Sequence, residues 1–353
     1  MPNLDDAVSY EKLDPAGMRA RIAELPQQCA AAWRLAQELC LPAAYRRARQ
    51  VVVAGMGGSA IGGALLNGLV ADDCPAPLLS VRGYDLPAHV GADSLVVASS
   101  YSGNTEETLS VFDQAVDRGC MVLAMTTGGK LAERAEKLDL PVLRFAYRSA
   151  PRAALGYSFI LLLGLLSHLG LLRDYSAAVD EAIAVLETWQ QELAPKMPTK
   201  RNPAKQLALR LVDRLPVVYG AGFLGPVAQR WKGQFNENSK CWAFWEELPE
   251  IHHNAVLGYG MPDDVREEIT VLMLRSPLDH PRVQARWEAT EELLRQARVA
   301  QDTVWGRGES ALAQMLSLIH CGDYTSLYLA VLNGVDPTAM APIEQLKRRL
   351  AQM

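Results

Sequence analysis

The stretch that decides the fold runs Ser94-Leu95-Val96-Val97-Ala98-Ser99-Ser100-Tyr101-Ser102-Gly103-Asn104-Thr105-Glu106-Glu107-Thr108. Its apolar first third, residues 94–98, predicts a buried strand of a parallel sheet. Residues 109–116, which follow the stretch, have the apolar spacing of a helix. A strand that passes through a tight turn into a helix is typical of an α/β protein with a doubly wound parallel sheet.

The turn between this strand and this helix is rich in hydroxyl groups. Ser100, Ser102 and Thr105 supply neutral hydrogen-bond donors at the start of the helix, where backbone N–H groups and the helix dipole favour an anion. Gly103 lets the backbone approach a ligand closely. Because the turn contains no lysine, it predicts a site for a small phosphomonoester rather than for a magnesium triphosphate.

A second interpretation of the turn needs no ligand. Asn104 is a residue type favoured at a helix N-cap, and Glu107, three residues later, is the type found as its capping-box partner. Under this interpretation the polar residues of the turn only start a helix. The turn alone leaves both interpretations open.

Size and composition restrict the class of protein. With 353 residues, 49% of them hydrophobic and 21% charged, the chain has the composition of a globular protein of two domains. Its net charge of -5 argues against a nucleic-acid partner, which would favour a basic surface. The six cysteines form no Cys-x-x-Cys pair, and the acidic start, residues 1–6, is unlike a signal peptide. We therefore expect a cytoplasmic protein with reduced thiols and no metal site.

One segment has the length of a membrane span. Residues 153–172 are twenty residues without a formal charge, between Arg152 and Arg173. The segment contains glycine, serine and histidine residues, and no second segment like it is present. We therefore expect a helix buried in the protein or at a subunit interface, and no membrane partner.

Predicted strands and helices alternate along most of the chain. The predicted strands are 51–54, 77–81, 94–99, 120–126, 141–145, 216–219, a part of 267–275, and 298–303. The predicted helices between them are 59–70, one from 104, 131–138, 225–235, 282–296 and 310–333. We expect four segments: an N-terminal helical segment 1–48, a first α/β domain 49–150, connecting helices 151–202, and a second α/β domain 203–353 with a C-terminal helix.

Two glycine-rich turns support a rival function. Residues 55–60 match a loose G-x-G-x-x-A pattern, and residues 220–225 match G-x-G-x-x-G. Each follows a predicted strand, as in a nicotinamide-dependent dehydrogenase. Asp85 is the nearest acidic candidate for a ribose contact. This interpretation leaves the Ser100–Thr105 cluster without a role, so we do not favour it.

Several separated motifs resemble one family. Gly57-Gly58-Ser59-Ala60, together with residues 100–108, resembles a sugar isomerase (SIS) domain. The second half is similar to the bifunctional phosphoglucose/phosphomannose isomerases, in Asn236-Glu237-Asn238-Ser239-Lys240, Leu248-Pro249-Glu250-Ile251-His252-His253-Asn254 and Gly322-Asp323-Tyr324-Thr325-Ser326-Leu327-Tyr328-Leu329-Ala330. The resemblance extends from about residue 50 to the C-terminus and implies two tandem SIS-type domains. Two departures are His252, where the family usually has Asn, and extra residues around 175–205.

The resemblance also implies the site residues. It assigns the substrate phosphate to Gly58, Ser59, Ser100, Ser102 and Thr105. It implies that Glu237 moves a proton between C1 and C2, as one carboxylate can do in a cis-enediol mechanism. His253 matches the ring-opening histidine, which the family supplies from the neighbouring subunit, although His252 competes for this role.

The resemblance implies roles for three further residues. Arg152 corresponds to an arginine that stabilises the enediolate, with Arg148 close enough to confuse the match. Lys347 resembles a C-terminal lysine that returns to the site, and Thr338 resembles the threonine that makes room for both C2 epimers. Met340 competes with Thr338 for that position.

The implied activity is interconversion of glucose 6-phosphate, and of mannose 6-phosphate, with fructose 6-phosphate. The resemblance implies a homodimer with hexose 6-phosphate substrates, no cofactor and no metal. A non-catalytic SIS protein that senses a phosphosugar is the alternative from a different class. Of these two, we favour the isomerase.

Overall fold

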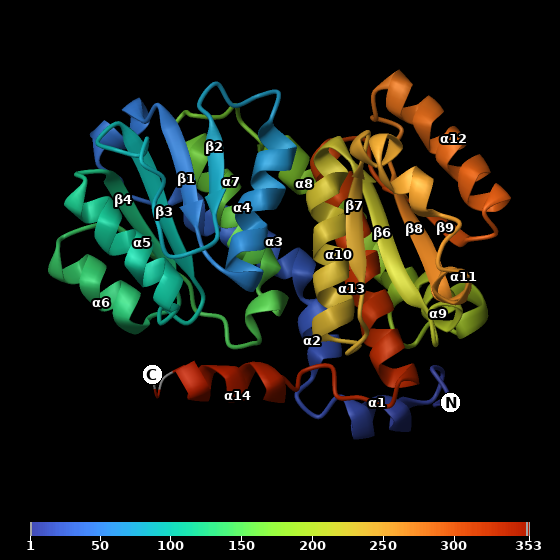
Figure 1. Ribbon diagram of the computed structural model, residues 1–353. Coiled ribbons are helices and arrows are strands. Elements are labelled where there is room, and N and C mark those ends of the chain that lie inside the picture. The colour runs from blue at the N-terminus through green and yellow to red at the C-terminus, as the bar shows by residue number, and fades with distance from the viewer. Residues whose placement is uncertain (1, 351, 353) are drawn as a thin grey trace. The chain divides into compact units, whose positions relative to one another are not determined.

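The structure is a computed structural model that describes residues 2–350 and 352, and its chain divides into two compact units. The first-sheet unit consists of Glu24–Glu187 and Arg307–Leu316. The second-sheet unit consists of Met1–Ala23, Thr188–Gly306 and Ser317–Met353. Each unit contains one parallel sheet (Figure 1).

The first-sheet unit has five parallel strands in the order β2-β1-β3-β4-β5. Their bounds are Gln50–Ala54 (β1), Leu78–Val81 (β2), Ser94–Ser100 (β3), Met121–Thr126 (β4) and Val142–Arg144 (β5). All seven residues of β3 are buried, as its apolar run predicts for a central strand. The β1 and β3 strands are neighbours, so the turns that follow them meet at the carboxyl edge of the sheet.

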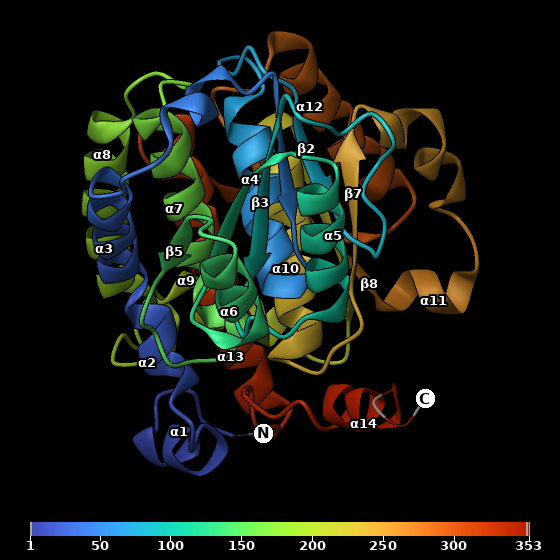
Figure 2. The same cartoon turned by 90° about the vertical axis from the view of Figure 1, so that its left-hand side faces the viewer.

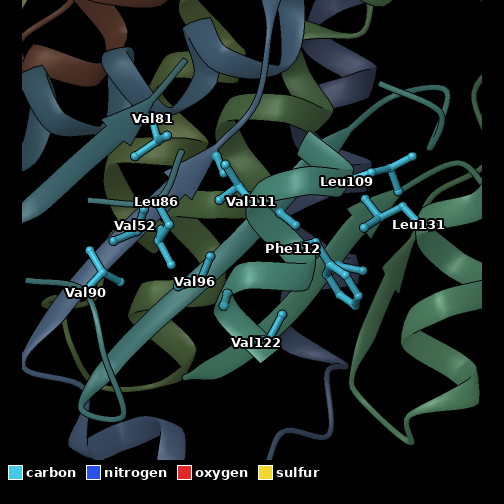
Figure 3. Packing of buried hydrophobic residues seen from close by; sticks show 14 of the residues in the cluster. Val52, Val81, Leu86, Val90, Val96, Leu109, Val111, Phe112, Val122 and Leu131 are labelled. Carbon is cyan, nitrogen blue, oxygen red and sulfur yellow. The ribbon is translucent and has the colours of Figure 1, made fainter. Parts of the chain in front are cut away.

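Helices α5 (Glu106–Asp117) and α6 (Gly129–Lys137) cover one face of this sheet (Figure 2). The core beneath them contains Val52, Val96 and Val122, which are register partners on the neighbouring strands β1, β3 and β4, packed against Phe112 of α5 and Leu131 of α6 (Figure 3). Because strand side chains alternate between faces, this packing leaves the neighbouring position Val53 on the opposite face.

Helices α4 (Gly57–Val70), α7 (Leu155–His168) and α3 (Leu25–Gln37) belong to that opposite side. A Cβ added at Gly63 of α4 would lie 2.9 Å from the Val53 side chain. Gly164 of α7 packs in the same close way on Ala36 of α3. The prediction of a buried helix in residues 153–172 is confirmed, since α7 is 14 residues long and most of its side chains are buried.

The second-sheet unit has four parallel strands in the order β7-β6-β8-β9. Their bounds are Leu215–Ala221 (β6), Phe244–Leu248 (β7), Ile269–Arg275 (β8) and Ala300–Trp305 (β9). Strand β7 was not among the predicted strands. Four of its five side chains are exposed or half-exposed at the edge of the sheet, so its sequence lacks the apolar pattern of a buried strand.

The remaining elements complete the two units. The helices are α1 (Ala7–Leu13), α2 (Met18–Ala23), α8 (Ser176–Leu193), α9 (Pro203–Arg210), α10 (Gly225–Glu237), α11 (Asp263–Glu268), α12 (Pro281–Gln296), α13 (Ala311–Leu332) and α14 (Ala341–Leu350). The short 3-10 turns are Ala43–Arg47, Pro151–Ala153, Thr199–Arg201, Gly222–Leu224, Glu250–His253 and Ala255–Gly258. Within the described residues, α13 alone is long and apolar enough to cross a membrane, and its most apolar window is 100% buried, as in a core helix.

The prediction of two parallel α/β sheets is confirmed, whereas the units cut the chain at different points from the four predicted segments. Helix α3 packs on α7 within the first-sheet unit, while α1 and α2 belong to the second. The N-terminal helices are therefore divided between the two units. Alternation of strands and helices reveals the sheets, but it carries no signal for which sheet a flanking helix joins.

Candidate functional site

Three hydroxyl groups meet where β1 and β3 end. Ser59, in the first turn of α4, accepts a hydrogen bond on its Oγ from the Tyr101 backbone N–H at 3.1 Å. The Ser100 Oγ and the Thr105 Oγ1 are 2.9 Å apart and hydrogen-bonded. Gly103 donates its N–H to the Ser100 Oγ at 3.1 Å, with its backbone at φ +68°. The structure therefore joins the two turns at the edge where an α/β sheet binds its ligands.

The helix after this turn begins differently from the capping interpretation. Helix α5 has Thr105 at its N-cap, and no side chain caps its N-terminus. Asn104 is therefore not the N-cap, and Glu107 is not at the capping-box position. The Asn104 side chain instead accepts from the Lys130 N–H at 3.2 Å and donates to the Ser102 carbonyl at 3.1 Å. The capping interpretation is wrong in this detail, and the first N–H groups of α5 are left for another acceptor.

Two residues of this turn have distinct surroundings. Ser102 is exposed, and its Oγ accepts from the Asn104 N–H at 3.3 Å. Tyr101 was not predicted as part of the site, yet its hydroxyl donates to the Tyr147 carbonyl and accepts from the Ser149 N–H at 2.7 Å. Tyr101 thereby ties residues 147–149 to the turn. The only sequence signal was an aromatic residue inside a run of small hydroxyl residues.

Gly58 lies against the backbone of Arg152. A Cβ added at Gly58 would be 2.8 Å from the Pro151 carbonyl carbon and 2.9 Å from the Arg152 nitrogen. Only glycine fits this approach, which brings Arg152 beside the β1 turn. The Arg152 side chain is 2% exposed, whereas Arg148 is exposed. Of the two arginines that compete for the enediolate role, Arg152 is the one next to the predicted phosphate residues.

Glu237 belongs to the other unit, at the last position of α10. Its side chain is half-buried. The Lys240 ammonium donates to the backbone carbonyls of Glu237 and Pro337, the latter at 3.3 Å. This bridge brings Thr338 next to the end of α10. Among the described residues, the buried Thr338 hydroxyl has no hydrogen-bond partner, a feature that suits a polar ligand atom.

The two neighbouring histidines are in different environments. The His252 Nε2 and the Thr290 Oγ1 are 2.8 Å apart, and the Arg286 guanidinium is 3.0 Å from the His252 Nδ1. Burial, the Arg286 charge and His253 together lower the pKa of His252. His253 is exposed on the 3-10 turn that follows β7. Both ring nitrogens of His252 are therefore engaged by residues of α12, whereas the exposed His253 is accessible to another molecule.

Lys347 lies on α14, where all ten side chains are exposed. The structure does not bury this lysine in a site, so its predicted return to the substrate stays a prediction. The two groups of predicted residues belong to different units. Gly58, Ser59, Ser100, Ser102, Thr105 and Arg152 are in the first-sheet unit, and Glu237, His253, Thr338 and Lys347 are in the second.

In the second-sheet unit, the G-x-G-x-x-G turn is in contact with the side-chain carboxylate of Glu247. A Cβ added at Gly225 would lie 2.3 Å from the Glu247 Oε1, so this carboxylate rests on the first turn of α10. Burial raises the pKa of Glu247. A dinucleotide pyrophosphate binds at this place in a dehydrogenase, and the Glu247 carboxylate would block and repel it. The turn therefore does not support the dehydrogenase interpretation.

No group of three or more His, Cys, Asp or Glu side chains within the described residues is arranged to hold a metal ion. The chemistry available at the predicted positions is that of hydroxyls, backbone N–H groups, an arginine, a carboxylate and a histidine. These groups can bind an anion, move a proton and stabilise an oxyanion.

Known proteins resemble this chain over nearly its whole length. Residues 200–350 match the family model of a bacterial phospho-glucose isomerase C-terminal SIS domain. A protein of Caldicellulosiruptor bescii, named bifunctional phosphoglucose/phosphomannose isomerase, is 41% identical over 333 residues, which cover 94% of this chain and 98% of that protein. A protein of the same name from Aquifex aeolicus is 37% identical over 301 residues, covering 85% of this chain and 90% of that protein.

A solved structure agrees with these relatives on the fold. The crystal structure of a hypothetical protein from Thermus thermophilus superposes with a TM-score of 0.74, covering 98% of this chain and 92% of that chain at 17% identity. At that identity the likeness concerns the fold alone. The two parallel sheets and the close relatives lead to one conclusion: the chain has two SIS-type domains and belongs to the bifunctional phosphoglucose/phosphomannose isomerase family.

Proposed function

We propose that this protein interconverts glucose 6-phosphate and mannose 6-phosphate with fructose 6-phosphate. The names of its relatives at 41% and 37% identity support this activity. The reaction is an intramolecular oxidation and reduction: C2 of the aldose is oxidised as C1 is reduced, and one proton moves between the two carbons. It therefore needs no external oxidant.

The observation that carries the proposal is the hydroxyl cluster at the uncapped N-terminus of α5. Ser59, Ser100 and Thr105 gather there around N–H groups that no side chain caps. Three phosphate oxygens offer enough acceptors for these donors, and the helix dipole favours their charge. Neutral donors also release a phosphomonoester more readily than a lysine would, which suits an enzyme that must release its product.

The remaining residues would supply the chemistry. His253 would open the pyranose ring by exchanging a proton with the ring oxygen and the C1 hydroxyl. Glu237 would then remove the proton from C2 and return it to C1 on one face of the cis-enediolate. The Arg152 guanidinium would stabilise the negative charge that develops on O1 and O2. Thr338 would line the space at C2 that accepts both epimers, and Lys347 would approach from the C-terminal helix.

We further propose a cytoplasmic homodimer in which His253 acts on the substrate of the partner subunit. The exposure of His253 supports this arrangement. Leu257 and Met261, a few residues later, are 88% and 77% exposed, which is unusual for large apolar side chains unless another surface covers them. Mixing inactive Glu237→Gln protein with inactive His253→Ala protein should restore up to about a quarter of the activity if subunits exchange, because one of two sites in a mixed dimer is intact.

The test of the activity is a coupled assay with the three hexose 6-phosphates, repeated with Glu237→Gln. We expect the wild-type protein to convert all three substrates. Glu237→Gln should lose turnover by several orders of magnitude while still binding fructose 6-phosphate, because the amide keeps the shape of the side chain but cannot accept the proton. Wild-type protein that binds fructose 6-phosphate without converting it would establish the non-catalytic sensor instead.

A further inference from the structure

Glu237 occupies a position that is mobile in most helices. It is the last residue of α10, where backbone groups lack partners within the helix and the end tends to fray. A base that transfers a proton has to be held precisely, since a displacement of about 1 Å can cost about a hundredfold in rate. Other residues must therefore fix the end of this helix.

Ser326 of α13 makes hydrogen bonds to both residues that follow Glu237. Its Oγ accepts from the Asn238 Nδ2 at 2.9 Å, and its backbone carbonyl accepts from the Ser239 Oγ at 2.7 Å. All three residues have 0% exposure, so these bonds are shielded from water. The Ser326 Oγ also donates to the Asp323 carbonyl at 2.8 Å. That bond leaves the hydroxyl oxygen oriented to accept from Asn238.

A second set of bonds fixes the chain immediately after this point. The Ser239 carbonyl accepts from the Asn333 Nδ2 at 3.0 Å. Lys240 has φ +54°, a left-handed conformation that usually requires glycine at the end of a helix. The Cys241 N–H then donates back to the Phe235 carbonyl at 3.1 Å. Helix α13 and the residue that follows it therefore hold both sides of the α10 terminus, through Ser326 on one side and Asn333 on the other.

We propose that Ser326 is a positioning residue for the isomerisation: by holding Asn238 and Ser239, it fixes the direction in which the Glu237 carboxylate leaves the end of α10. The inference rests on the proposed role of Glu237 as the proton carrier. A hydroxyl is required because one atom both accepts from Asn238 and donates to Asp323. Alanine at this position can do neither, whereas threonine supplies a hydroxyl that can do both.

The test compares Ser326→Ala with Thr325→Val on the same helix. Thr325 is equally buried, and its hydroxyl donates to the Cys321 carbonyl at 2.8 Å, within α13 itself. Both variants lose one buried hydroxyl, so both should lower the melting temperature. We expect Ser326→Ala to lower kcat for fructose 6-phosphate about 10- to 100-fold, with KM changed less than about threefold. Thr325→Val should keep the wild-type kcat, and Ser326→Thr should restore most of it.

A kinetic isotope effect separates positioning from lost stability. With aldose substrate deuterated at C2, Ser326→Ala should show a larger primary isotope effect on kcat than wild type, because proton transfer has become slower relative to the other steps. If Ser326→Ala fails to fold, Ser239→Ala is the second variant: it removes the other bond between Ser326 and the α10 terminus, the one to the Ser326 carbonyl, and should give the same isotope signature. An unchanged kcat in the folded variant, or an equal loss in Thr325→Val, overturns the positioning role. Wild-type protein without isomerase activity overturns the proposed function instead.

Discussion

The two sheets share a topology and differ in what their turns hold. In both, the first strand lies between the second and the third, in the orders β2-β1-β3-β4-β5 and β7-β6-β8-β9. The turn after the first strand has a glycine at φ +51° in each unit, Gly57 in one and Gly222 in the other. A Cβ added at either glycine would contact nothing within 4 Å, so the backbone conformation, rather than space, requires the glycine.

The difference lies in the side chains around these matching turns. In the first-sheet unit, the turns after β1 and β3 gather the hydroxyls of Ser59, Ser100 and Thr105. In the second-sheet unit, the Glu247 carboxylate rests on the turn after β6, and the turn after β8 contains Asp279, whose carboxylate accepts from the Trp287 Nε1 at 2.9 Å. Carboxylates at these places repel a phosphate. The same fold therefore gathers hydroxyl groups at this edge of the sheet in one unit and carboxyl groups at the matching edge in the other.

Removing the hydroxyl groups from the turn after β3 of the first-sheet unit should have the largest effect on substrate binding. The triple variant Ser100→Ala, Ser102→Ala, Thr105→Ala should raise KM for fructose 6-phosphate about 10- to 1,000-fold, because three hydrogen bonds of roughly 0.5–1.5 kcal/mol each are lost. The measurement is steady-state kinetics, with kcat expected to fall less than KM rises. Ser276→Ala, in the turn after β8, is the matched control and should leave KM unchanged. An unchanged KM in the triple variant would remove this cluster from the substrate site.

Adding one methyl group to a glycine in the turn after the first strand should destabilise the first-sheet unit more than the second. At Gly58 a Cβ would collide with the backbone of Pro151 and Arg152, which has little freedom to move, so Gly58→Ala should cost roughly 1–3 kcal/mol of stability and raise KM. At Gly225 the colliding group is the end of the Glu247 side chain, which can rotate away. Gly225→Ala should therefore cost less than about 1 kcal/mol. Thermal unfolding of both variants measures the difference, and equal losses would contradict it.

The two units also differ in how much of their structure can be predicted from the sequence. The apolar runs at 51–54 and 94–98 predict β1 and β3 because these strands are buried on both faces. Strand β7 was not predicted because four of its five side chains are exposed or half-exposed at a sheet edge, so its sequence is not a continuous apolar run. Residue types also indicate a hydroxyl cluster, but not that Thr105 rather than Asn104 precedes α5. The contact between Gly58 and Arg152 joins residues far apart in the chain, and neither local pattern nor spacing carries such information.

The second-sheet unit contains a buried histidine that should lower the stability of the protein in acid. His320 of α13 is fully buried, and neither ring nitrogen has a hydrogen-bond partner among the described residues. Burial lowers the pKa of His320 to about 3, below its ordinary value of 6.5. Between these two pH values His320 is protonated in the unfolded chain but not in the folded chain. The free energy of unfolding therefore falls as the pH drops from 6.5 toward about 3.

We expect His320→Leu to reduce this loss by about 2 kcal/mol between pH 7 and pH 5. Scanning calorimetry of wild type and variant at both pH values measures it. The control is His89→Gln in the first-sheet unit, where the side chain is exposed and the substitution should change nothing. If His320→Leu loses as much stability as wild type on acidification, His320 is not the group responsible.

We expect the smallest effect from removing the Glu247 carboxylate from the turn after β6. Glu247→Ala removes the carboxylate from the first turn of α10 and leaves N–H groups that can bind inorganic phosphate. At a phosphate concentration equal to its Kd, the variant should gain about 0.4 kcal/mol of stability that wild type does not gain. Melting temperatures with and without phosphate, at matched ionic strength, test this. An identical phosphate response in both proteins would show that Glu247 does not fill an anion position.

The division of the chain between the two units has a consequence for synthesis on the ribosome. Residues Met1–Ala23 are translated well before the rest of their unit, which begins at Thr188. The first sheet is made early, yet its unit also lacks Arg307–Leu316 until most of the chain has been translated. Neither unit can therefore be completed during translation of a contiguous half. In a nascent chain, each unit therefore exposes apolar surface until its late segment, Arg307–Leu316 in one and the segment from Ser317 in the other, has been translated.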